Sequence, residues 1–105
     1  MHGPPEHLSD EAAGWWRRLS DEFDLSDPGA ELLLQTALEA FDRMRGAQKL
    51  IAEQGAAITD RFEQVKPHPL LPAERDSRAQ MLAALKALNL DLDPTRQNIG
   101  RPAGR

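Results

Sequence analysis

Cysteine is absent from this 105-residue sequence, and aromatic side chains are scarce. Without a thiol, the chain can form neither a disulfide framework nor a thiolate metal site. Two tryptophans and three phenylalanines are the only aromatic residues that can anchor a core. No apolar run approaches the roughly 20 residues of a membrane-spanning helix, and the first residues lack the basic and apolar regions of a signal peptide. We therefore expect one soluble, intracellular domain.

Recognisable catalytic machinery is also missing from the sequence. No glycine-rich phosphate loop with a lysine is present, so nucleotide hydrolysis by this chain is not expected. The acidic residues lie at expected helix starts and on polar faces, without the convergent spacing of a metal-dependent nuclease. His2 and His7 lie in a proline-containing start, and His68 stands between two prolines; a lone histidine is more often structural than a metal ligand. The sequence predicts a protein that is not an enzyme and has no metal or cofactor.

Charge is spread unevenly along the chain, whose net charge is −4. Residues 1–30 carry seven acids and two arginines, whereas residues 94–105 carry three arginines and no acid. A mildly acidic body argues against a monomer that binds nucleic acid strongly, because such affinity depends on neutralising phosphates. The domain plan that we expect is a disordered start at 1–7, a helical oligomerisation domain at 8–93 and a flexible basic tail at 94–105.

Two helices are predicted before the middle of the chain. Ser9 is a good N-cap for a helix over 10–23, because acids follow it where the helix dipole favours negative charge. Asp27 followed by Pro28 signals the start of a second, long helix, which runs to Gln54 and stops at Gly55. Apolar residues of the long helix recur at alternating steps of three and four, and they form a seam that widens along a flanking row of alanines. The seam residues that we assign to oligomerisation are Leu34, Ala37, Phe41, Met44 and Ile51.

A short insert and a third helix complete the predicted fold. Residues 55–69 read G-A-A-I-T-D-R-F-E-Q-V-K-P-H-P, with alternating polar and apolar positions and extended backbone before the prolines. A third helix is expected from Pro69 or Pro72 to Leu88, with an apolar face that Asn89 terminates. The face expected for that helix comprises Ala79, Leu82, Leu85 and Leu88, and the alternation of Leu88, Leu90 and Leu92 then predicts an extended strap on apolar surface. The fold class is therefore mainly α: a helical hairpin with one long central helix, an extended or β-hairpin insert, and a third helix.

Adjacent Trp15 and Trp16 point about 100° apart on a helix. One ring should pack on the long helix, and the other should lie at a subunit contact or under the chain's ends, because tryptophan is enriched at interfaces. A single broad internal core that holds both rings is the alternative. Since the seam of the long helix is too wide for one neighbouring helix, we expect a ring-like homo-oligomer, in which closed symmetry supplies the missing surface.

Several basic residues are candidates for DNA contact. Arg17 and Arg18 follow the tryptophans, and Arg61 and Lys66 lie in the insert. Most such charges are simply solvated, so a DNA surface requires their repetition by symmetry.

The order and spacing of these features resemble one family, the short small subunits of bacteriophage terminases. The likeness extends from Leu8 to Pro102, and it is carried by Leu8-Ser9 through Trp15-Trp16, the helix over 32–41, the insert and the exit from the third helix. It also includes Gly100-Arg101-Pro102 and the alanine-containing stretch after the insert. None of these is a catalytic signature.

The resemblance implies a helical, ring-forming, non-catalytic protein of a DNA-packaging motor in the cytoplasm of a bacterial host. Its expected partners are the large terminase subunit, which holds the ATPase and nuclease, and double-stranded DNA bound weakly and with little sequence preference. Relatives often carry an N-terminal helix-turn-helix domain, whereas this chain begins at the helical hairpin; a gene transfer agent would suit that form. The tail residues Arg96, Arg101 and Arg105 are the expected contacts to the large subunit. The competing interpretation is a small helical adaptor that binds another protein through the same apolar seam.

Overall fold

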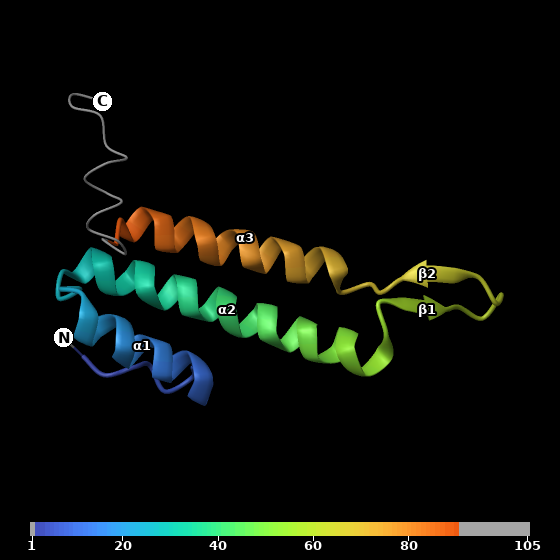
Figure 1. Cartoon of the computed structure of the whole chain (residues 1–105), viewed down its shortest axis with the longest axis horizontal. Coiled ribbons are helices and arrows are strands. Elements are labelled where there is room, and N and C mark those ends of the chain that lie inside the picture. Colours follow the sequence, from blue (N-terminus) through green and yellow to red (C-terminus); the bar gives the residue numbers. More distant parts are fainter. Residues whose placement is uncertain (1, 91–105) are drawn as a thin grey trace, which may run out of the picture.

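Three helices and one β-hairpin make up the structure, a computed structural model that describes residues 2–90 (Figure 1). The long α2 lies between α1 and α3, and the hairpin joins α2 to α3 and projects from the far end of the helices. The mainly helical class predicted from the sequence is thereby confirmed. The elements are α1 (Asp10–Glu22), α2 (Pro28–Gln54), β1 (Ala57–Thr59), β2 (Val65–Pro67) and α3 (Leu71–Leu88).

The helix boundaries follow local capping signals. Ser9 Oγ accepts a hydrogen bond from the Ala12 backbone N–H, and Asp27 caps the N–H of Ala30 in the same way. Gly55 ends α2 with a φ of 90°, a conformation that a side chain would strain. Asn89 ends α3 in the left-handed region, as predicted. The helices therefore begin and end within one or two residues of the expected positions.

The core lies along α2, where the predicted seam is buried within the chain. Leu34 and Ala37 are fully buried, and Phe41 and Met44 nearly so. The flanking alanines at 40 and 47 are buried too, which lets the neighbouring helices approach closely. The chain therefore covers much of this seam by itself, with α1 on one side and α3 on the other.

The apolar face expected for α3 is confirmed only in part, because Leu88 packs against the core whereas Ala79 and Leu82 are exposed. The side chains that α3 buries most deeply are Glu74, Ser77 and Ala84, with Met81 and Leu88 partly buried along the same row, whereas Leu82 is 54% exposed. Small residues bring α3 close to α2, and Glu74 is tolerated there because Gln48 and Arg78 both bond its carboxylate. Apolar character alone did not reveal which row faces α2.

Residues 2–9, which precede α1, contact the helices, although the sequence predicts disorder for the first seven residues. Leu8 is buried in the core, and Ser9 donates from both its backbone N–H and its hydroxyl to the Asp42 carboxylate. His2 and His7, expected to be solvated, bond Glu31 and Glu39 of α2. These contacts tie the start of the chain to the first half of α2.

The insert is a two-stranded antiparallel hairpin in which Thr59 pairs with Val65. Asp60 organises its turn, because its carboxylate accepts the backbone N–H groups of Phe62 and Gln64 at 2.8 and 3.0 Å. Glu63 takes the left-handed conformation that completes a three-residue turn. The longest dimension of the molecule is 58 Å. No helix among residues 2–90 is both long and apolar enough to cross a membrane.

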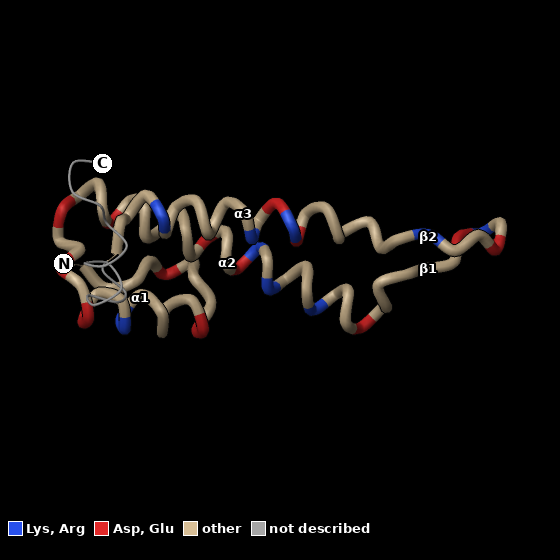
Figure 2. The backbone as a smooth tube through the Cα atoms, turned by 45° about the horizontal axis from the view of Figure 1, so that its top comes forward, with Lys and Arg blue, Asp and Glu red and all other residues tan. Residues whose placement is uncertain are grey.

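The two ends of the molecule differ in charge (Figure 2). The end formed by α1, the first half of α2 and the last turns of α3 (residues 2–42 and 81–90) carries ten acids and three bases, a net charge of −7. The other end (residues 43–80, with the hairpin) carries seven bases and five acids, a net charge of +2. The molecule therefore has an acidic end and a weakly basic half, and we call residues 43–80 the basic half.

Candidate functional site

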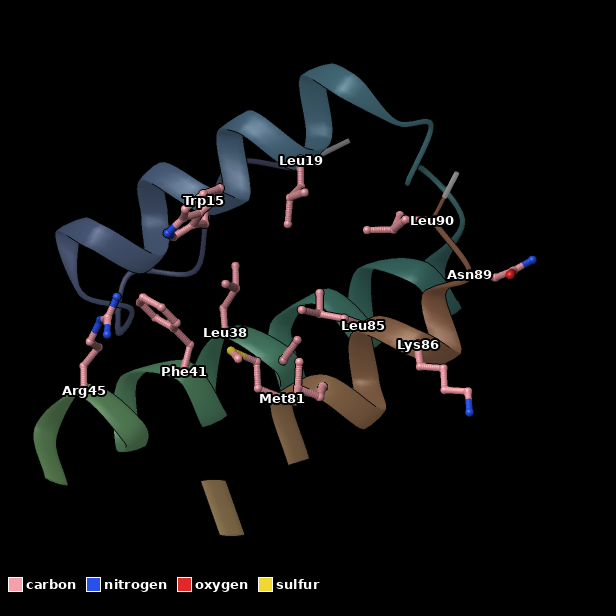
Figure 3. Close-up of a pocket in the computed structure, with 12 residues that line it drawn as sticks. Trp15, Leu19, Leu38, Phe41, Arg45, Met81, Leu85, Lys86, Asn89 and Leu90 are labelled. Carbon is pink, nitrogen blue, oxygen red and sulfur yellow. The ribbon is translucent and has the colours of Figure 1, made fainter. Parts of the chain in front are cut away.

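An apolar groove of about 450 Å³ opens between α1 and α3 over the surface of α2 (Figure 3). We call it the α1–α3 groove. Leu38 and Phe41 of α2 form its floor, and Leu90 lies at the end where the chain leaves α3. Its walls are Trp15 and Leu19 of α1, and Met81, Leu82 and Leu85 of α3. A concave, largely apolar surface of this size is typical of a site that receives another molecule.

The tryptophan pair explains how α1 supplies one wall. Trp16 is only 3% exposed and donates its indole N–H to the His2 backbone oxygen at 3.1 Å. Trp15 is 40% exposed, faces the groove, and has the Arg18 guanidinium 5.1 Å from its ring centroid. The two rings therefore divide between core and groove, rather than sharing one internal core.

A chain of polar contacts crosses the three helices at the edge of the groove. Arg45 of α2 bonds both Glu11 carboxylate oxygens on α1 at 3.3 Å and donates to Gln48 at 2.8 Å. Gln48 in turn donates to the Glu74 carboxylate on α3 at 2.9 Å. These hydrogen bonds from Gln48 and then from Arg78 hold the pKa of Glu74 below its ordinary value. The network links the three helices along this edge of the groove.

The predicted oligomerisation residues fall into two groups. Trp16 and the α2 residues Leu34, Ala37, Phe41 and Met44 are buried within one chain, and Ile51 is half-buried. Trp15 alone among them presents a large exposed apolar surface. The sequence analysis placed Leu82 and Leu85 on one apolar face of the third helix but did not identify them as groove residues. The exposed apolar surface is the α1–α3 groove, which lies beside the seam of α2. The role of the seam in assembly stays a prediction.

The four DNA-binding candidates are not brought together. Arg17 and Arg18 lie on α1, whereas Arg61 and Lys66 lie on the hairpin at the other end of the molecule. Lys66 pairs with Asp60 at 3.1 Å, and the Arg61 guanidinium lies 4.9 Å from the Phe62 ring centroid. Arg43 and Lys49, two exposed bases of mid-α2, belong to the same half of the molecule as the hairpin. The predicted large-subunit contacts Arg96, Arg101 and Arg105, and Leu92 of the predicted strap, lie outside the described residues.

His68 has a structural position at the base of the hairpin. Its ring is almost fully buried; Nδ1 accepts the Leu70 backbone N–H at 3.0 Å, so Nε2 carries the proton and donates to Gln54 Oε1 at 2.6 Å. Both ring nitrogens are thereby satisfied by the protein itself. Within residues 2–90, no cluster of three or more histidine or acidic side chains is arranged to hold a metal ion.

Comparison with known proteins adds no assignment: no protein-family model, no curated protein and no solved structure matches the chain.

Proposed function

We propose that this chain is the non-catalytic small subunit of a phage-type terminase, which forms a ring, engages DNA and regulates the large ATPase and nuclease subunit. The proposal rests first on the resemblance described above, in which the order of helices, insert and exit is that of the family. The structural observation that carries it is the α1–α3 groove, which residues 2–90 leave open to solvent. Exposed Trp15 and Leu82 on its walls favour a protein partner that covers them.

DNA binding by such a ring would use the basic half of each copy. One chain presents only a small positive excess there, and its acidic end repels phosphate. A ring that turns the basic halves toward a common channel would collect Arg43, Lys49 and Lys66 from every copy. We therefore expect weak binding with little sequence preference that falls steeply as salt is raised, because phosphate contacts release counterions.

The basic tail is the proposed contact to the large subunit. Removal of residues 94–105 should leave the number of subunits in the particle unchanged, because this polar stretch with several glycines and prolines is not expected to join an apolar core. The same deletion should weaken stimulation of the large subunit's ATPase more than it weakens DNA binding. The test compares full-length and truncated protein in both assays. A particle that dissociates without the tail would overturn this assignment.

The alternative is a small helical adaptor, for which the α1–α3 groove would receive a helix of another protein. The same open groove favours this function, since amphipathic helices bind such surfaces. Stimulation of a large terminase subunit by a ring would support the terminase proposal. A monomer that forms a one-to-one complex with an unrelated protein would support the adaptor instead.

A further inference from the structure

We propose that the hairpin tip of one copy, formed by residues 60–65, occupies the α1–α3 groove of the next copy. This contact would join successive subunits of the proposed ring, so the inference rests on the proposed function. It identifies a donor surface and an acceptor surface on the same chain.

The hairpin tip presents apolar side chains that the rest of residues 2–90 leaves exposed. Phe62 is 68% exposed and Val65 is 73% exposed. The turn that carries them is held by the two backbone N–H bonds to Asp60, and the base of the hairpin is held by the contacts of His68. A preorganised tip loses little conformational entropy when it binds, so its exposed phenylalanine is suited to act as an anchor.

The groove is an acceptor of matching character. Its walls and floor are aliphatic and aromatic, and about 450 Å³ is room for a phenylalanine with a neighbouring valine. The groove lies at the α1 end, whereas the hairpin projects from the opposite end of a molecule 58 Å long. A tip therefore reaches a groove only on another copy.

Charge favours the same arrangement. Asp60, Arg61 and Glu63 give the tip a net charge of −1, whereas the charged side chains that line the groove are the basic residues Arg45 and Lys86. Bringing the tip of one copy to the groove of another places opposite charges side by side, whereas joining two groove ends would bring like charges together. Because the two surfaces differ, the contact is heterologous, and repetition of such a contact closes a ring where the rotation between copies permits.

Engineered cysteines test the contact cleanly, because the natural chain has none. The test protein carries Gln64→Cys on the tip and Leu82→Cys on the groove wall, and it is treated with a short bis-maleimide. The matched control combines Gln64→Cys with Thr36→Cys, an exposed α2 position outside the groove lining. We expect a ladder of cross-linked species beyond the dimer, with about tenfold more product than in the control, because docking raises the effective concentration of the two thiols. Adding Phe62→Ser should abolish this excess while leaving the helical circular dichroism unchanged.

The possible failures separate the two proposals. Cross-linking no greater than the control, in a particle still larger than a dimer, would overturn the tip-to-groove contact and leave the proposed ring standing. Cross-linking that stops at the dimer would show a reciprocal, two-fold pairing, which overturns both the head-to-tail contact and the ring. A monomer that does not cross-link would likewise overturn both.

Discussion

Small side chains and one buried carboxylate, that of Glu74, allow α2 and α3 to pack closely. Alanines on α2 and Ser77 and Ala84 on α3 bring the backbones close, while the larger leucines of α3 remain at the groove. Trp15 and Trp16 differ by one position, yet one ring is in the core and the other in the groove. Position on the helix, more than residue type, therefore decides the role of each side chain.

A first prediction compares two leucines of the same helix. Leu34→Ala should lower the free energy of unfolding by about 2–5 kcal/mol, because it leaves a cavity at a fully buried position. Leu32→Ala is the control, since Leu32 is 66% exposed and its loss should cost only about 0.5 kcal/mol. Urea denaturation of both variants at one protein concentration measures the difference. Equal losses would mean that the α2 core is placed incorrectly.

A second prediction concerns the pH dependence contributed by Glu74. Its pKa in the folded protein lies below the ordinary value of 4.5, through hydrogen bonds from Gln48 and Arg78. A lowered pKa means that the stabilisation is fully present above the unfolded-state value and is lost as the pH falls through the folded-state pKa. Glu74→Gln should therefore be less stable than the natural chain near neutral pH, and the gap should narrow in acid.

Thermal unfolding of Glu74→Gln and of the natural chain, from neutral pH into acid, measures this difference in stability. Glu39 and Asp60 also have lowered pKa values, so only the difference between variant and natural chain isolates Glu74. A gap that stays constant from neutral pH into acid would contradict the assigned network.

At the scale of elements, the sequence predicts the helices well, because their ends depend on local signals. Ser9, Asp27 and Asn89 act on the residues next to them, so their effect can be recognised without knowing the fold. The face of α3 and the ordering of the start of the chain depend on partners far along the sequence. Glu74 can be buried because Gln48 of α2 donates a hydrogen bond to its carboxylate. The His7 ring is held in the same way by a hydrogen bond with Glu39. The groove was missed for the same reason, because it exists only once three helices are packed.

A third prediction is that the contacts of His68 hold the hairpin in its position relative to α2. His68→Ala removes the contacts to Gln54 and Leu70, and losing such buried hydrogen bonds costs about 1–3 kcal/mol. Hydrogen exchange of the hairpin amides should become about tenfold faster or more, while the amides of mid-α2 keep their rates. His7→Ala is the control, because His7 is exposed and bonds Glu39 of mid-α2, away from the hairpin. Unchanged hairpin exchange in His68→Ala, measured by NMR, would show that other contacts hold the hairpin.

At the scale of the whole molecule, residues 2–90 form an elongated structure with an acidic end and a basic half, and the α1–α3 groove is open to solvent. The seam of α2 is largely satisfied within the chain, so a substitution such as Phe41→Asp would disrupt the fold before it tested assembly. Leu82→Asp is the better probe of assembly, because Leu82 is exposed on the groove wall. This placement moves the expected subunit contact from the seam to the groove and the hairpin tip.

The mass of the purified particle in solution tests the ring most directly, and light scattering during size-exclusion chromatography measures it. The account predicts one species whose mass is a multiple of 11.7 kDa greater than two. Leu82→Asp should shift that species to smaller particles while retaining the helical circular dichroism, and Leu32→Asp, exposed but outside the groove lining, should not. A single 11.7 kDa species at micromolar concentration would contradict the ring.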